Sequence, residues 1–253
     1  MIETKNIKKS FGDKTILHDV SLVMETGKCN LIIGSSGSGK TVLMKCLVGL
    51  FTPDKGQILY DGESMTEIGE DKRKELRQKI GMLFQGSALF DSMTVEQNIL
   101  FPLDMFTTLR LREKKQKVNE VLDRVNMKDA NKKFPAEISG GMKKRVGIAR
   151  SIVLNPKYLF CDEPNSGLDP NTSILIDNLI MEITEEYNIT TVINTHDMNS
   201  VMEIGQNILF LKNGLKAWQG TKEEIFRTDN EAVTDFVYSS NLFKKVREAV
   251  LKG

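Results

Sequence analysis

The segment Gly34-Ser-Ser-Gly-Ser-Gly-Lys-Thr41 is the most informative part of this 253-residue sequence. It fits the pattern G-x-x-x-x-G-K-[S/T], in which small residues let backbone N–H groups close around phosphate oxygens. A helix that follows would offer its positive N-terminal end to the same anion. The lysine can reach the β- and γ-phosphates, and the threonine hydroxyl can ligate Mg²⁺. We therefore predict a nucleotide site made of Gly34, Ser35, Ser36, Gly37, Ser38, Gly39, Lys40, Thr41 and Val42.

The flanks of this loop separate a phosphate site from a chance glycine- and serine-rich turn. Residues 31–33 (Leu-Ile-Ile) form an apolar run before the loop, and an apolar helical segment follows it and ends near Gly49. Strand, loop and helix thus occur in the order that a phosphate loop requires.

Length and composition limit the possible classes of protein. A chain of this length suits one large domain, with or without an inserted subdomain. Its 35 basic and 34 acidic residues nearly cancel, so composition suggests no nucleic-acid partner. Cys29, Cys46 and Cys161 lack metal-ligand spacing, which fits a reducing cytoplasm. No run approaches about 20 apolar residues, and the N-terminus lacks a signal-peptide core, so we expect the chain not to cross a membrane.

The hydrophobic pattern elsewhere predicts alternating strands and helices. Thr94 and Gln97 form a capping-box pattern at a helix start, and Pro102 is expected to interrupt the segment that this helix begins. The expected elements are a β-rich segment 2–33 with a turn at Gly12-Asp13, a strand 56–60 with a turn at Asp61-Gly62, a helix 71–78, a strand 79–84, helices 112–125 and 143–154, a strand from 158, a helix 172–186, a strand 190–194, a hairpin 208–218 and a helical tail 233–253.

Polar residues come directly after several of these predicted strands. Gln85 ends one strand, Asp162 and Glu163 end a second, and His196 follows a third. In open α/β sheets, ligands bind beyond the carboxyl ends of the strands. Asp162 can hold Mg²⁺, and Glu163 can act as the general base for an attacking water or position it. An isolated histidine is more often structural, but the strand-end position of His196 favours a functional role.

Two further positions leave alternatives open. Ser139-Gly140-Gly141 begins a predicted helix and could bind phosphate, or it could be an ordinary serine N-cap. The basic residues 143–145 next to it could be mere surface charge. Phe11 could stack on an adenine base or could equally be a core residue on a strand.

Together these motifs resemble the nucleotide-binding subunit of ABC transporters over nearly the whole chain. The resemblance implies an α/β P-loop NTPase fold with a mainly parallel sheet, an N-terminal antiparallel β subdomain and an inserted helical subdomain. It implies an ATPase domain at 1–232, with the helical insert at about 86–156, and a C-terminal helical extension at 233–253.

The resemblance also implies residue roles. Glu163, His196 and Gln85 would be catalytic, and Thr41, Gln85 and Asp162 would hold Mg²⁺. ATP would bind at the phosphate loop, with Phe11 beside the adenine. Ser139, Gly140, Gly141 and Met142 would form a signature loop that acts in trans, near the D-loop residue Asp169, so a homodimer with two ATP sites is expected. Met142 replaces the usual glutamine, and Phe11 stands where tyrosine is common.

A finer resemblance concerns residues 87–99, the nearby Phe101-Pro-Leu, and the Ile138-Ser-Gly-Gly-Met-Lys-Lys-Arg-Val146 segment. These look like ATPases of Mla/Mce-type phospholipid transporters. That resemblance implies membrane-spanning permease subunits, a lipid-binding Mce-type subunit, a small regulatory subunit and a peripheral position on the cytoplasmic face of the inner membrane. The alternatives are an amino-acid-type solute importer, a soluble ABC ATPase in translation or DNA repair, and a non-hydrolysing nucleotide-binding regulator. The intact Asp162-Glu163 pair argues against the last.

Overall fold

The computed structural model describes residues 1–238 and 245, which contain two β-sheets and the helices around them. The strands are β1 (Ile2–Phe11), β2 (Lys14–Met24), β3 (Cys29–Ile33), β4 (Lys55–Tyr60), β5 (Glu63–Ser64), β6 (Ile80–Leu83), β7 (Tyr158–Asp162), β8 (Thr190–Thr195), β9 (Asn207–Lys212) and β10 (Leu215–Gly220). The helices are α1 (Lys40–Leu47), α2 (Glu70–Gln78), α3 (Val95–Phe106), α4 (Leu111–Arg124), the 3-10 helix η1 (Pro135–Glu137), α5 (Gly140–Ile152), α6 (Pro170–Glu186), α7 (Met198–Ile204), α8 (Lys222–Ile225) and α9 (Glu231–Val237).

The predicted site residues lie at the carboxyl ends of the parallel strands in the larger sheet. Its strand order is β10-β9-β3-β8-β7-β6, with β10 antiparallel to β9 and the other neighbours parallel. Ile33 pairs with Thr195, and Asp162 pairs with Asn194. The carboxyl ends of β3, β6, β7 and β8 therefore lie together, so the phosphate loop, Gln85, the two acids and His196 all come after strands that end at the same edge.

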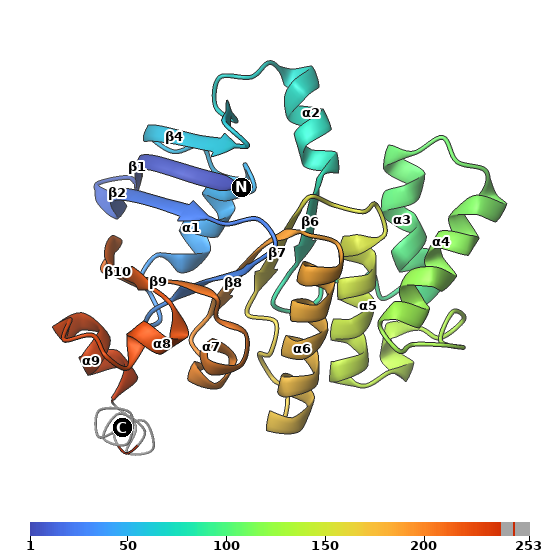
Figure 1. Ribbon diagram of the computed structural model, residues 1–253. Coiled ribbons are helices and arrows are strands. Elements are labelled where there is room, and N and C mark those ends of the chain that lie inside the picture. The colour runs from blue at the N-terminus through green and yellow to red at the C-terminus, as the bar shows by residue number, and fades with distance from the viewer. Residues whose placement is uncertain (239–244, 246–253) are drawn as a thin grey trace.

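Helices and the second sheet cover the larger sheet on its two faces (Figure 1). On one face, buried apolar residues of α1 pack with those of the antiparallel sheet β2-β1-β4-β5. On the other face, α5 and α6 pack on β6, β7 and β8 through a second apolar cluster, which continues into α3 and α4. Figure 1 shows α3 and α4 at the end of the molecule away from the antiparallel sheet. The predicted fold class, with its mainly parallel core and helical segment between β6 and β7, is confirmed.

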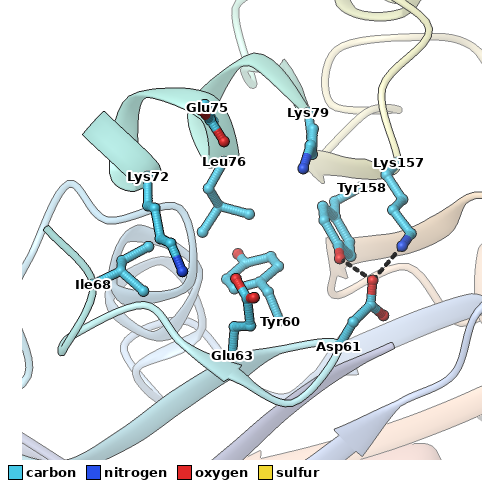
Figure 2. A pocket seen from close by; sticks show the side chains of 10 residues that line it. All are labelled: Tyr60, Asp61, Glu63, Ile68, Lys72, Glu75, Leu76, Lys79, Lys157 and Tyr158. Carbon is cyan, nitrogen blue, oxygen red and sulfur yellow. Dashed lines mark hydrogen bonds and ion pairs between the residues drawn. The ribbon is translucent and has the colours of Figure 1, made fainter. Parts of the chain in front are cut away.

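Asp61, in the turn between β4 and β5, links the two sheets beside a cavity of about 350 Å³ (Figure 2). Its carboxylate accepts a 2.7 Å hydrogen bond from Tyr158 Oη and pairs with Lys157 and with the N-terminal amine of Met1. Although burial raises the pKa of Asp61, the hydrogen bonds from these three groups hold it well below its ordinary value. The Tyr60 ring meets the Tyr158 ring edge-on at 4.7 Å between centroids, which adds an apolar contact between the sheets.

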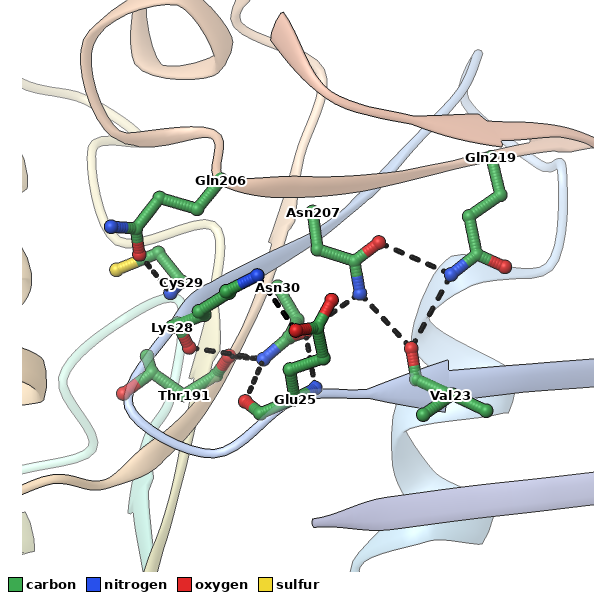
Figure 3. Close-up of polar contacts among 9 residues, drawn as sticks. All are labelled: Val23, Glu25, Lys28, Cys29, Asn30, Thr191, Gln206, Asn207 and Gln219. Atoms are coloured by element: carbon green, nitrogen blue, oxygen red, sulfur yellow. Dashed lines mark hydrogen bonds and ion pairs between the residues drawn. The ribbon is translucent and has the colours of Figure 1, made fainter.

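Asn30 of β3 joins the sheets at another point (Figure 3). This buried side chain donates to the backbone oxygens of Glu25 and Thr191 at 3.0 Å and accepts from Asn207 Nδ2 at 2.8 Å. Asn207 in turn donates to the backbone oxygen of Val23 at 3.0 Å. An amide inside an apolar strand is costly unless it is fully hydrogen-bonded, and here it connects β2, β3, β8 and β9.

The order and type of the predicted elements are confirmed up to residue 238, but the expectation for Pro102 was wrong. Helix α3 continues through Pro102 after starting at the predicted capping box of Thr94 and Gln97. Proline removes one helical hydrogen bond, but Ile99 and Leu103, on either side of it, are buried in the apolar cluster. That burial keeps the helix intact.

Two smaller findings concern the rest of the chain. Cys29, Cys46 and Cys161 are free and buried. Within residues 1–238, no helix is both long enough and apolar enough to span a membrane.

Helix α9 crosses the proposed domain boundary at 232/233, and the division stays a prediction. The remainder of the predicted helical tail, apart from residue 245, lies outside the described residues.

Candidate functional site

The phosphate loop connects β3 to α1 and depends on glycine at two positions. Gly34 has φ 147°, and a Cβ there would lie 2.2 Å from the backbone oxygen of Leu211. Gly39 has φ 105° and forms the N-cap of α1. Side chains at these positions would clash or strain the backbone, so glycine allows the loop to close tightly at the start of the helix.

Lys40 lies inside this loop. Its side chain is only 7% exposed, and Nζ donates to the backbone oxygens of Gly34 at 2.8 Å and Ser35 at 3.1 Å. Burial lowers the pKa of Lys40, while the nearby carboxylates of Glu163 and Asp162 oppose that shift. The ammonium group is thus bonded within the phosphate loop and lies within the electrostatic influence of the acids at the end of β7.

The residues of the loop fit a phosphate group. Ser38 Oγ is buried and has no hydrogen-bond partner among residues 1–238, so the loop holds a hydroxyl still able to bond. Thr41 is exposed at the first turn of α1, where its hydroxyl and the free N–H groups of the helix end are available.

Asp162 is the carboxylate suited to a cation. Asn194 Nδ2 of the neighbouring strand donates to Asp162 Oδ1 at 3.1 Å, which fixes the carboxylate and leaves its second oxygen available. No group of three or more His, Cys, Asp and Glu side chains within the described chain could hold a metal ion. A cation at Asp162 would need further oxygen ligands, which the phosphates of a bound nucleotide could supply.

Glu163 and His196 are brought together across the ends of β7 and β8. The distance from His196 Nδ1 to Glu163 Oε1 is 2.9 Å, and both residues line a cavity of about 470 Å³. Glu163 has φ 47°, a left-handed conformation unusual for a residue with a side chain. Such backbone strain is common at functional sites. The pair can position a water molecule and accept a proton from it.

Gln85 reaches the same region, and a lysine stabilises the loop that carries it. Gln85 Nε2 donates to Ser166 Oγ at 3.3 Å. Lys144 Nζ donates to the backbone oxygen of Gln85 and, at 3.3 Å, to that of Glu163. Lys144 is only 4% exposed, which excludes the alternative that its side chain is mere surface charge. Burial lowers its pKa, while Cys161, Asp162 and Glu163 oppose that shift.

Sequence reasoning did not assign a role to Asn194, Lys144 or Ser166. A signal was present for Asn194, because its polar amide lies within a strand that is buried along its whole length. Lys144 lies four residues before the buried Ile148, on the face of α5 that packs on the sheet. Ser166 carried no signal beyond its place in a turn-rich loop.

The signature segment lies at the start of α5, beside the start of α6. Ser139 is exposed and caps α5, accepting a hydrogen bond from Met142 N at 3.2 Å. A Cβ on Gly141 would lie 2.6 Å from Thr172 of α6, so this glycine permits close contact between the two helix starts. No hydrogen bond among the described residues joins Ser139 to the phosphate loop. Met142 is half-buried and packs on the core.

Asp169 caps the neighbouring helix α6. Its Oδ1 accepts from Thr172 N at 3.1 Å, and the hydrogen bonds from Thr172 lower its pKa. The predicted D-loop and signature residues are therefore adjacent on the surface.

Phe11 lies at the tip of the β1–β2 hairpin and is 44% exposed, which excludes the core alternative. Its ring meets Phe51 edge-on at 5.2 Å, and Lys9 Nζ lies 5.3 Å from the ring centre. One ring face is thus accessible enough to stack on a base, and that role stays a prediction.

Comparisons with known proteins agree on a single family. A model of the ABC transporter family matches residues 17–166. The chain is 39% identical over 236 residues to the "Probable ribonucleotide transport ATP-binding protein mkl" of Mycobacterium leprae, covering 93% of this chain and 68% of that protein. It is 38% identical to the methionine import ATP-binding protein MetN of Campylobacter jejuni, covering 95% of this chain and 76% of that protein.

Solved structures show the same similarity. The dimeric, post-hydrolysis ATP-binding cassette MJ0796, bound to ADP and Pi, matches with a TM-score of 0.79 and 29% identity, over 87% of this chain and 98% of that chain. The cbiO1 protein of Clostridium perfringens, part of the ABC transporter complex cbiONQ, matches with a TM-score of 0.83 and 28% identity, over 99% and 98% of the two chains.

Proposed function

The chain belongs to the ABC transporter family as an ATPase subunit, and we propose that two copies of it form composite ATP sites that drive lipid transport through a membrane permease. The 2.9 Å contact between His196 Nδ1 and Glu163 Oε1 carries the catalytic part of this proposal. Glu163 would position the attacking water and take its proton, and His196 would hold the Glu163 carboxylate in place.

We assign ATP to the phosphate loop and Mg²⁺ to Thr41, Gln85 and Asp162. Lys40 would exchange its two backbone oxygen partners for phosphate oxygens, since it is already held beside Asp162 and Glu163. Bound Mg²⁺ would neutralise charge that develops on the transferred phosphate group. Phe11 would stack on the adenine.

The position of the signature segment supports a head-to-tail dimer. Ser139 to Met142 lie beside α6 and make no hydrogen bond to the phosphate loop among the described residues. The exposed N-terminal end of α5 can instead supply donors to the phosphate of a second copy. The dimeric MJ0796 structure supports this arrangement for a chain of the same fold. Asp169, next to this segment, would lie at the interface between the copies.

An apolar groove gives the permease a docking site. The groove has a volume of about 420 Å³ and runs from the end of β6 to α3, and the aromatic residues that line it are Phe84, Phe90, Phe101 and Phe106. Phe84 directly precedes Gln85, so a permease helix seated in the groove would sense movement of the catalytic site. Such docking would hold the chain on the cytoplasmic face of the membrane.

The lipid cargo rests on the residues shared with Mla/Mce-type ATPases. Phe90 and Phe101, whose rings meet at a tilt with 5.0 Å between their centres, belong to the residues of that resemblance and line the groove. The partners would then include a permease, an Mce-type lipid-binding subunit and a small regulatory subunit. The second candidate cargo is a small solute, since relatives are named for methionine import and ribonucleotide transport.

Purification of the tagged full chain from its native membranes tests this proposal. We expect a permease and an Mce-type subunit to co-purify, with phospholipid detected by mass spectrometry. Phe90→Asp in the groove should release the permease, whereas Leu111→Asp, an exposed residue outside the groove, should not. Recovery of a solute-binding protein in place of the Mce-type subunit would contradict the lipid assignment.

A further inference from the structure

Asp177 on α6 is a buried carboxylic acid to which the mechanism above gives no role. Its side chain is only 2% exposed. It faces two segments of the catalytic site at once, namely the loop after β7 that contains Glu163 and the helix α7 that begins two residues after His196. A buried acid is costly, so its contacts need an explanation.

Asn165 and Ser200 are the two partners of Asp177. Asn165 lies two residues after Glu163, and its Nδ2 donates to Ser200 Oγ of α7 at 3.0 Å. Both side chains also form hydrogen bonds to the Asp177 carboxyl group. Asp177 Oδ1 and Asn165 Oδ1 are buried atoms without a partner among residues 1–238. Asn165 and Ser200 thus connect the loop after β7 to α7 beside a buried carboxyl group.

We propose that Asp177 is a positioning residue for ATP hydrolysis. Through Asn165 and Ser200, its carboxylate ties the loop that contains Glu163 to helix α7, which begins two residues after His196. Loss of this tie would let the loop after β7 and helix α7 move apart. The 2.9 Å contact between His196 and Glu163 would then be populated less often. The inference rests on the ATPase function proposed above, and it adds a residue that touches neither nucleotide nor water.

The carboxyl group of Asp177 changes its protonation state near physiological pH. Burial raises the pKa of Asp177 to about 6, against the lowering effect of the hydrogen bonds from Ser200 and Asn165, and Asp197 and Glu203 of α7 raise it further. The thiols of Cys29 and Cys161 also face this carboxyl group, and burial raises the pKa of both, so they stay neutral. Above pH 6 the carboxylate accepts hydrogen bonds from both partners. Below pH 6 it is protonated, and the tie weakens.

Steady-state ATP hydrolysis by the full chain, measured from pH 5 to 8, tests the proposal with Asp177→Asn. The ratio of wild-type to variant kcat removes the pH effects that the two proteins share. We expect this ratio to rise through a single step near pH 6 and to reach about fivefold or more, with KM for ATP nearly unchanged. Asp235→Asn, an exposed carboxylate on α9, should show a flat ratio near one.

Ser200→Ala gives an independent test that removes only a hydroxyl group. Because the Ser200 hydrogen bond lowers the pKa of Asp177, its loss should move the step in the ratio to higher pH. A ratio near one at every pH for Asp177→Asn, or an unmoved step for Ser200→Ala, would overturn the positioning role while leaving the ATPase assignment intact. A wild-type chain that hydrolyses no ATP would instead overturn both.

Discussion

Lys40 shows how a single residue prepares the site. Its ammonium group is buried and bonded to two carbonyl oxygens of its own loop, so the site keeps a positive charge in place before a phosphate arrives. Replacing Lys40 by Ala removes charge-assisted hydrogen bonds worth about 1.5–3 kcal/mol, and we expect affinity for ATP to fall about 10- to 100-fold. Isothermal titration calorimetry checks this. Lys45→Ala on the same helix is the control, and equal ATP affinity for the two variants would refute the role of Lys40.

At the same scale, the sequence identifies groups that act at strand ends but not those that hold them in place. Glu163 and His196 were recognisable because each comes after an apolar strand. The roles of Lys144 and Asn194 depend on which strands and helices become neighbours. That information is tertiary, so the spacing of the basic residues 143–145 could not show which of their side chains is buried.

At the scale of the element, the loop after Gln85 is held by one amide at the start of α3. Asn98 is fully buried, and it accepts from Phe90 N at 2.8 Å and donates to the backbone oxygens of Phe90, Met93 and Thr94 at 3.0–3.1 Å. We expect Asn98→Ala to lower the free energy of unfolding by about 3 kcal/mol, because buried backbone groups lose their partners.

Urea unfolding measures this loss, and Gln97→Ala is the matched control. Gln97 neighbours Asn98, is exposed and serves only the capping box of α3, so its replacement should cost about 1 kcal/mol or less. If both variants lost the same stability, Asn98 would not be the residue that holds the loop.

Periodicity predicted most elements because apolar spacing differs between strands and helices. Pro102 was misjudged because local propensity opposes a helix there, whereas burial of Ile99 and Leu103 maintains one. Local rules cannot measure tertiary burial, so this exception was not accessible from the sequence.

At the scale of the whole molecule, the parallel order β9-β3-β8-β7-β6 brings four loops to one edge of the sheet. Motif order predicted that they meet, but the pairing of strands remote in sequence had to come from the structure. The links of Asn30 and Asp61 between the sheets were likewise invisible in the sequence, because their partners lie on distant strands.

The whole molecule still presents half of each proposed site, since among the described residues no hydrogen bond joins Ser139 to the phosphate loop of its own chain. Glu163→Gln should bind ATP but not hydrolyse it, so the closed dimer should accumulate. Light scattering with ATP and Mg²⁺ is therefore the most direct test of this mechanism. We expect the 28.5 kDa chain to double its mass with ATP and to remain a monomer with ADP. A variant that binds ATP yet stays monomeric, or that hydrolyses ATP at the wild-type rate, would contradict the composite site.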